Sequence, residues 1–272
     1  MSTVDSIGAV LVGLPHAGKS SYLALLYLAI LKRERCSIEL ATSKDDREHV
    51  NALMQALLMC KEAPRTEVAQ KKGLKLSIRD RNGSEGVLEI PDLSGETWQD
   101  VLETASVDVG LSEEMGRAAA AVIFLHVGDF TADPLISEVN AGADALGAEA
   151  TPEGVSPSSH GPSQVDIAQL LQSVDELAGG SCDISIVLSA FDLVDSVAPR
   201  QWLDDNAPLL SQYIYANRTR RHIRVFGLSA QGGDFATDSE SLSKRDGLER
   251  ASVVDEDGER VDVDEPILGG RT

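Results

Sequence analysis

A glycine-rich motif near the N-terminus has the residue types and spacing of a phosphate-binding loop. The pattern G-x-x-x-x-G-K-[ST] is matched by Gly13-Leu14-Pro15-His16-Ala17-Gly18-Lys19-Ser20. In this geometry, successive backbone N–H groups surround a β-phosphate and the start of a helix adds positive potential. Lys19 is then expected to reach the β- and γ-phosphates, and the Ser20 hydroxyl to bind Mg²⁺. The predicted nucleotide-binding residues of this segment are Gly13, His16, Ala17, Gly18, Lys19, Ser20 and Ser21.

An ordinary glycine-rich turn between a strand and a helix is the alternative interpretation of this segment. Pro15 has no N–H and is not expected to bind phosphate. His16 keeps its N–H, and we expect its imidazole to face solvent.

A second motif, Asp92-Leu93-Ser94-Gly95, follows a predicted strand. A carboxylate at a strand end is well placed to hold Mg²⁺, directly or through water. The Gly95 N–H can contact a γ-phosphate because no side chain intervenes. Glu96 stands where a water-orienting catalytic residue is expected, although an acid favoured by the helix dipole is the other interpretation. We therefore expect Asp92 in the metal site, and Gly95 and Glu96 in the catalytic site.

A hydroxyl that senses the γ-phosphate through Mg²⁺ is expected on the loop before the second predicted strand. Thr66 occupies that loop, whereas the competing Thr42 precedes a long predicted helix. Arg65 adjoins Thr66 and is a candidate for stabilising transition-state charge; a solvated loop arginine is the alternative. The sequence thus predicts Thr66 as metal ligand and catalytic residue, with Arg65 beside it.

Two further motifs have the chemistry to read a nucleotide base. Ser189-Ala190-Phe191-Asp192 ends a predicted strand. An Asp192 carboxylate can accept from N1–H and the exocyclic amine of guanine, whereas adenine would leave it unpaired. Ser229 and Ala230 end the last predicted strand, where a backbone N–H can donate to guanine O6. A cap between strand and helix is the alternative role of Asp192.

Buried parallel strands are expected to position these motifs, because the predicted strands are continuous apolar runs. A hairpin is expected around Asp80 to Gly86. Helices are expected over Lys19 to Leu31, Lys44 to Glu62, Gly95 to Ala105, Val165 to Ala178 and Trp202 to Asn217. The six expected strands are Ile7 to Val12, Leu74 to Arg79, Val87 to Ile90, Ala120 to Val127, Ile184 to Ser189 and Ile223 to Leu228.

From Ile7 to Gly232, the five motifs together resemble the Ras-like G domain of the TRAFAC class of P-loop GTPases. The resemblance implies an α/β, three-layer P-loop NTPase fold, with a mainly parallel six-stranded sheet and one antiparallel edge strand. It also implies Mg²⁺-dependent hydrolysis of GTP to GDP, with switch loops around Thr66 and Gly95. Two departures weaken the match: Ser189-Ala190 replace the first two residues of N/T-K-x-D, and Glu96 replaces the usual Gln.

The long segment between Ser20 and Thr66, the D-x-S-G-E motif and the acidic C-terminus also resemble bacterial double-GTPase domains of conflict systems. This narrower resemblance implies a regulatory GTPase that works with an effector or another protein encoded in the same operon. Two other functions stay open: a non-hydrolysing, nucleotide-gated interaction module and an ATP-using P-loop phosphotransferase.

The charge balance bears on partners and on domain organisation. The chain of 272 residues carries 24 basic and 44 acidic residues, a net charge of -20, which disfavours nucleic-acid binding. We expect a GTPase domain over 1–232, with a Gly/Pro/Ser-rich insertion at about 129–163, and an acidic extension over 233–272. Asp234 to Glu265 holds 12 acidic and 4 basic residues and is expected to be a solvated hairpin turning at Asp257-Gly258 or a partner-binding segment.

The remaining composition favours a cytoplasmic protein without a membrane span. The longest apolar runs are about ten residues, well short of the roughly 20 that a spanning helix needs. The N-terminus has no basic start followed by an apolar stretch, and the three cysteines are scattered. We expect the cysteines to be buried, not catalytic, and Mg²⁺ to be the metal, because the five histidines have no paired zinc-site spacing.

Overall fold

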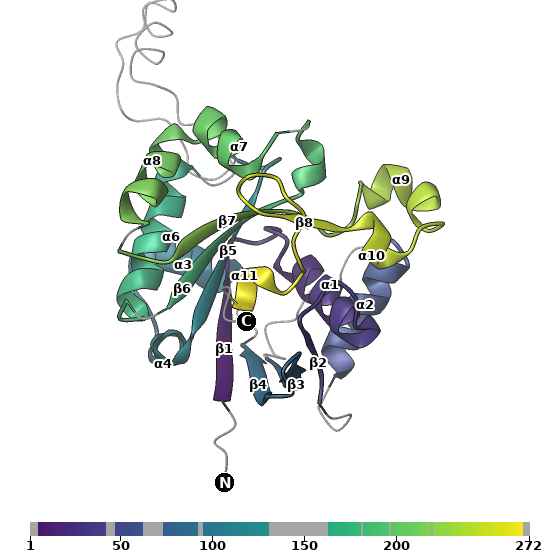
Figure 1. Cartoon of the computed structure of the whole chain (residues 1–272). Helices are drawn as coiled ribbons and strands as arrows, with labels where there is room; N and C mark the ends of the chain where they lie inside the picture. Colours follow the sequence, from purple (N-terminus) through teal and green to yellow (C-terminus); the bar gives the residue numbers. More distant parts are fainter. Residues whose placement is uncertain are drawn as a thin grey trace, which may run out of the picture.

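The computed structural model describes residues 5–41, 47–61, 73–91, 95–130, 163–180, 182–195, 197–218 and 220–268. Eight strands form one sheet in the order β2-β3-β4-β1-β5-β6-β7-β8 (Figure 1). The strands are β1 (Asp5–Val12), β2 (Ile38–Leu40), β3 (Leu74–Asp80), β4 (Glu85–Ile90), β5 (Ala120–His126), β6 (Asp183–Ser189), β7 (Ile223–Ser229) and β8 (Ser252–Val254).

The five central strands, β4, β1, β5, β6 and β7, are parallel to one another. β3 is antiparallel to both β2 and β4, and β8 is antiparallel to β7. The central strands are apolar on both faces because each face is covered by helices. In β5, for example, Phe124 and Leu125 belong to the two separate hydrophobic cores on opposite faces of the sheet.

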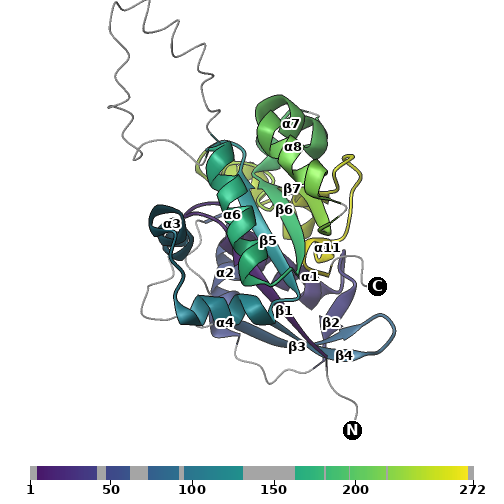
Figure 2. The same cartoon turned by 90° about the vertical axis from the view of Figure 1, so that its left-hand side faces the viewer.

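Helices on both faces give a three-layer α/β fold (Figures 1 and 2). One face is covered by α1 (Lys19–Lys32), α2 (Glu48–Leu58), α10 (Gly247–Arg250) and α11 (Glu265–Leu268). The other is covered by α3 (Gly95–Thr104), α4 (Val109–Arg117), α6 (Gln164–Leu177), α7 (Pro199–Asn206) and α8 (Pro208–Asn217). Within the described ranges, no helix combines the length and apolar character that crossing a bilayer requires.

The predicted α/β architecture is confirmed, but the predicted six strands are too few. β2 and β8 are the additional strands, and each has three residues. Such short strands give almost no alternating or continuous apolar signal in the sequence. The prediction of one antiparallel edge strand was also incomplete. β8 is an antiparallel edge strand, and β3, the second strand from the opposite edge, is antiparallel to the central strands as well.

Other elements agree with their predictions or differ for local reasons. The predicted hairpin is present as β3 and β4. The helix predicted over Trp202 to Asn217 is two helices, because Pro208 begins a new helix directly after α7. α4 was not predicted, and its start is marked by Asp108, whose side chain accepts a hydrogen bond from the Leu111 N–H.

The acidic segment after Gly232 folds onto the sheet and is not simply solvated. It forms α9 (Phe235–Leu242), α10, β8 and α11, with buried side chains such as Val253 and Val263. The predicted turn at Asp257-Gly258 is confirmed, since the Gly258 N–H donates to the Asp255 carbonyl. Several acids have structural roles: the side chains of Asp234 and Asp246 cap α9 and α10.

Arg250 ties this C-terminal segment to α2. Its side chain is 5% exposed, and it donates to the Leu57 carbonyl, to the Leu242 carbonyl at 3.0 Å and to the Cys60 sulfur at 2.9 Å. These acceptors lie at the ends of α2 and α9, so one cationic side chain joins three helices. Hydrogen bonds from a charged donor contribute more than those from neutral groups.

Replacing Arg250 by methionine is expected to lower the free energy of unfolding by about 2–4 kcal/mol, because two buried carbonyls lose a charged donor. Urea denaturation checks this. Arg245→Met is the matched control in the same segment, since Arg245 is exposed and makes one long bond, 3.4 Å to the Glu249 carbonyl. Equal midpoints for the two variants would contradict the expectation.

Candidate functional site

The predicted motifs gather at one edge of the sheet. The Gly13–Ser20 segment follows β1, the Ser189–Asp192 segment follows β6, and Ser229 ends β7. These three strands are parallel and linked through β5, so their carboxyl ends lie on the same side. Ligands of open α/β sheets bind at this edge, outside the carboxyl ends of the strands.

Lys19 closes the Gly13–Ser20 loop from inside. Its ammonium group donates to the Gly13 carbonyl at 2.5 Å and to the Leu14 carbonyl at 2.9 Å. The Ala17 N–H donates to the same Leu14 carbonyl at 3.3 Å. The loop therefore curves around the ammonium group, which holds a positive charge beside the start of α1.

Both motif glycines have a structural reason to be glycine. Gly13 and Gly18 have φ of 151° and 97°, which side chains rarely permit. A Cβ on Gly18 would lie 3.0 Å from Ser189 Cβ, and one on Gly13 would lie 3.1 Å from the Phe124 carbonyl oxygen. His16 also takes a positive φ, 63°, and its side chain is exposed as predicted.

The N-terminus of α1 is left without a neutralising side chain. Gly18 is its N-cap and provides no side-chain hydrogen bond, and no acidic residue stands in the first turn. By contrast, Ser163 and Asp246 cap α6 and α10 with side-chain oxygens. The first N–H groups of a helix lack intrahelical partners and carry positive potential, so this end of α1 suits an anion. Ser20 and Ser21 lie in its first turn, half-buried.

Gly95 lies directly against the same loop. A Cβ added there would come within 2.3 Å of the Pro15 nitrogen and 2.7 Å of the Leu14 carbonyl carbon. Trp98, one turn later in α3, is fully buried and donates from Nε1 to the Leu11 carbonyl of β1 at 3.3 Å. This anchor fixes the start of α3 on the loop. The sequence analysis missed Trp98. Its spacing of three residues from Gly95 is the signal that could have found it, because residues three apart lie on the same face of a helix.

Four residues weighed for this site, Thr42, Arg65, Thr66 and Asp92, lie outside the described residues. Glu96 is described and is exposed in the first turn of α3. No group of three or more His, Cys, Asp or Glu suited to a metal occurs in the described ranges. Of the three predicted Mg²⁺ ligands, Ser20 is the one within the described ranges, and it lies on the uncapped start of α1.

Ser189 connects the Ser189–Asp192 segment to the Gly13–Ser20 loop. It is 3% exposed, and its hydroxyl donates to the Ala17 carbonyl at 2.7 Å. This hydrogen bond joins the end of β6 to the Gly13–Ser20 loop. Ala190, the next residue, takes a left-handed conformation with φ of 53° and begins the 3-10 turn η1 (Phe191–Leu193).

Asp192 lies in that turn with an exposed side chain. Within the described part of the chain, its carboxylate makes no hydrogen bond or ion pair, so it is available to a ligand. Phe191 holds the turn in place, because its ring covers Gly227 of β7 so closely that a Cβ there would lie 2.6 Å away. The turn, and with it Asp192, is therefore set against β7.

The Ser229–Ala230 segment is the next strand end and is buried. The Ser229 hydroxyl accepts a hydrogen bond from the Gly232 N–H at 3.1 Å, which closes the loop. Gly232 has φ of 76°, and a Cβ there would lie 2.4 Å from the Arg250 carbonyl oxygen. The loop thus rests on α10 of the C-terminal segment.

Replacing Ser189 by alanine is expected to lower the free energy of unfolding by about 1–2 kcal/mol, because the buried Ala17 carbonyl loses its donor. If the loop binds nucleotide, affinity should fall roughly threefold to tenfold, the equivalent of about 0.7–1.4 kcal/mol. Thermal unfolding with and without nucleotide checks both effects.

Ser185→Ala is the matched control for Ser189→Ala. Ser185 is 1% exposed in the same strand but contacts Arg224, at 3.4 Å, and not the loop. An equal loss of nucleotide response in this control would show that the effect does not come from the Ala17 contact.

The cysteines do not form a nucleophilic site. Cys36, Cys60 and Cys182 are buried, as the sequence predicted, and none of them forms a disulfide. Burial and the charge of Asp264 raise the pKa of the Cys36 thiol well above its usual range, so that it stays protonated near neutral pH. A thiolate mechanism therefore has no support here.

Comparison with known proteins gives one family-level result. The family model described as Double-GTPase 1 matches residues 10–268, which is nearly the whole chain and includes the C-terminal segment. No curated protein matches the chain.

Proposed function

The chain belongs to the Double-GTPase 1 family and is a P-loop GTPase domain, and from that premise we propose that it is a Mg²⁺-dependent, GTP-hydrolysing regulatory switch. The observation that supports this most directly is the convergence of three features at one sheet edge. These are the loop closed by Lys19, Gly95 packed on that loop, and the Ser189 hydroxyl that joins the base-side turn to it.

On the phosphate side, Lys19 and the first N–H groups of α1 bind the β- and γ-phosphates. Ser20, with the predicted Thr66 and Asp92, would hold Mg²⁺, which when bound offsets phosphate charge. The Gly95 N–H contacts the γ-phosphate. Transfer to water passes through a loose transition state, so positioning and positive charge matter more than a covalent nucleophile. Arg65 adds charge at this stage and Glu96 orients water.

On the base side, the exposed Asp192 carboxylate accepts hydrogen bonds from guanine, and a backbone N–H of the Ser229–Ala230 segment donates to O6. Adenine offers an acceptor where guanine offers N1–H and would leave the carboxylate unpaired. Ala190 has no long stem to lay over the base, so selectivity depends mainly on Asp192.

The GTPase domain proper is assigned to 1–232, with an insertion at about 129–163 and an extension over 233–272. The switch acts in the cytoplasm on an effector or on a protein encoded in the same operon. GTP and GDP are its small-molecule partners.

Thermal unfolding with GTP, GDP or ATP, each with Mg²⁺, tests the assignment. GTP and GDP are expected to raise the melting temperature more than ATP does. Asp192→Asn should remove most of this difference, because an amide cannot accept from both guanine donors with full charge. Asp195→Asn is the matched control, since Asp195 is exposed in the same loop. A larger response to ATP, unchanged by Asp192→Asn, would refute guanine selectivity.

A non-hydrolysing, nucleotide-gated interaction module is the second candidate. It is favoured by Glu96, which is exposed at the start of α3 and carries a negative charge toward any approaching phosphate. Multiple-turnover release of phosphate from GTP separates the two functions. Release would support the hydrolase, and stable GTP binding without release would support the module.

A further inference from the structure

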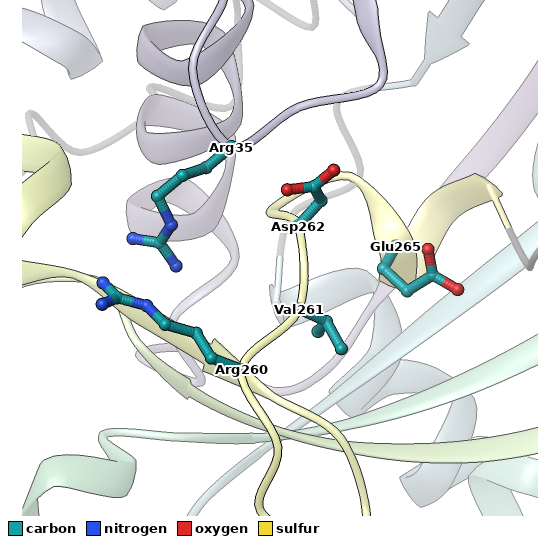
Figure 3. Close-up of a pocket in the computed structure, with 5 residues that line it drawn as sticks. All are labelled: Arg35, Arg260, Val261, Asp262 and Glu265. Atoms are coloured by element: carbon teal, nitrogen blue, oxygen red, sulfur yellow. The ribbon is translucent and has the colours of Figure 1, made fainter.

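A pocket lies at the end of α1 that is opposite to the predicted nucleotide site. It is lined by Arg35, Arg260, Val261, Asp262 and Glu265 (Figure 3). Arg35 follows the C-terminal end of α1, whereas Lys19 begins that helix. α1 has 14 residues, so its two ends are roughly 21 Å apart at 1.5 Å per residue. The two sites are therefore separate.

Two arginines converge in this pocket. Arg35 Nη1 donates to the Leu248 carbonyl at 2.9 Å and to the Ala251 carbonyl at 2.8 Å. Arg260 Nη2 donates to the same Ala251 carbonyl at 2.9 Å. Figure 3 shows the two guanidinium groups facing each other. A shared acceptor thus holds two like charges close together, which is unfavourable unless negative charge is supplied.

Neither arginine has a carboxylate partner among the ion pairs of the described residues. Arg35 Nη2 is buried without a hydrogen-bond partner. Burial and the nearby charge of Arg260 lower the pKa of the Arg35 guanidinium, although the Asp262 carboxylate opposes this in part. A buried donor without an acceptor is costly, so Arg35 carries a surplus hydrogen-bond donor beside the pocket.

The two carboxylates of the pocket are bound to other arginines. Asp262 pairs with Arg81 at 2.9 Å, and Glu265 pairs with Arg224 at 3.1 Å. The Glu265 side chain points away from the arginine pair in Figure 3. The charge of the Arg35 and Arg260 pair is therefore only partly offset by the acids of its pocket: Asp262 acts on Arg35 but is itself paired with Arg81.

The backbone around Arg35 is fixed by the C-terminal segment. The Arg35 carbonyl accepts a hydrogen bond from the Val263 N–H at 2.8 Å. On the other side of Val263, the buried Asp264 carboxylate accepts from the Ser37 N–H at 2.8 Å. These bonds join the loop after α1 to the chain after Arg260. The arginine pair is thus built into the fold before any ligand arrives.

We propose that this pocket binds a phosphate-type oxyanion through Arg35 and Arg260. Guanidinium groups present parallel N–H donors that match phosphate oxygens, and a dianion balances two cations. A single carboxylate offers less charge and fewer acceptors. The ligand class is therefore a phosphorylated small molecule or inorganic phosphate, bound apart from the nucleotide.

Isothermal titration of the GDP-saturated protein with inorganic phosphate, at ionic strength fixed with chloride, tests this proposal. GDP occupies the first site, so that phosphate binding reports on the second. Arg260→Gln is expected to weaken phosphate binding at least tenfold while GDP affinity stays within twofold. Arg220→Gln is the matched control, because Arg220 is exposed and lies between α8 and β7. It should bind phosphate like the unaltered chain.

Three results would overturn the proposal. These are no phosphate binding above the chloride background, equal weakening in Arg220→Gln, and acetate binding as tightly as phosphate. Arg260 is exposed, so its variant is expected to fold, and unchanged far-ultraviolet circular dichroism verifies this. The difference in phosphate affinity between Arg260→Gln and Arg220→Gln reports on the arginine pocket alone. It therefore stands even if the first site proves to prefer another nucleotide.

Discussion

Lys19→Ala is expected to reduce multiple-turnover release of phosphate from GTP by at least 100-fold. The ammonium group donates to the Gly13 and Leu14 carbonyls, and in the proposed function it also binds the β- and γ-phosphates. Loss of one preorganised donor to transition-state charge typically costs about 10²–10³ in rate. Loop closure is lost as well, so nucleotide affinity should fall together with turnover. Phosphate release and titration with GDP measure the two effects separately.

Lys32→Ala is the control for this variant. Lys32 ends the same helix and pairs with Asp246 on the surface, so its removal should cost less than about 1 kcal/mol and leave turnover unchanged. Full GTP turnover by Lys19→Ala would exclude the Gly13–Ser20 loop as the catalytic phosphate site. Loss of turnover in both variants would point to instability of α1.

Gly95→Ala is expected to lower GTP turnover by more than tenfold while GDP affinity changes much less. The new Cβ would lie 2.3 Å from the Pro15 nitrogen, a distance that real structures do not permit. Trp98 anchors α3 to β1, so the strain cannot be relieved by simple rotation of the helix. The start of α3 must move away from the loop, and with it the N–H proposed to contact the γ-phosphate. Turnover and titrations with GDP and a non-hydrolysable GTP analogue measure this selective effect.

Gly116→Ala provides the matched control. Gly116 lies in α4, and a Cβ there would meet nothing within 4 Å. The substitution should stabilise the helix by up to about 1 kcal/mol and leave turnover unchanged. If Gly95→Ala weakened GDP and GTP analogue binding equally, its effect would be general disruption of the loop and not loss of a γ-phosphate contact.

The C-terminal segment has a larger structural role than its acidity suggested. Arg250 joins it to α2, its carbonyl packs on Gly232 of the base-side loop, and Val263 joins it to Arg35. The family match extends to residue 268 and so includes this segment. The Ser229–Gly232 loop and the arginine pocket therefore share one supporting segment.

Local motifs were predictable from the sequence because consecutive residues encode them. Gly13, Gly18 and Lys19 specify a loop through backbone conformation and one side chain, and both depend on short spacing. The buried strands were predictable because continuous apolar runs have few other uses. Asp192 was placed at a strand end for the same reason. The α/β class and the GTPase resemblance follow from these local signals.

Only the tertiary structure decided the contacts between distant segments. It packed Gly95 on Pro15, joined Ser189 to Ala17 and brought Arg35 beside Arg260. It also added β2 and β8, whose three residues each carry little pattern of their own. Such contacts depend on which surfaces the packed helices and sheet bring together. That information is spread over the whole chain, so no short stretch of sequence contains it.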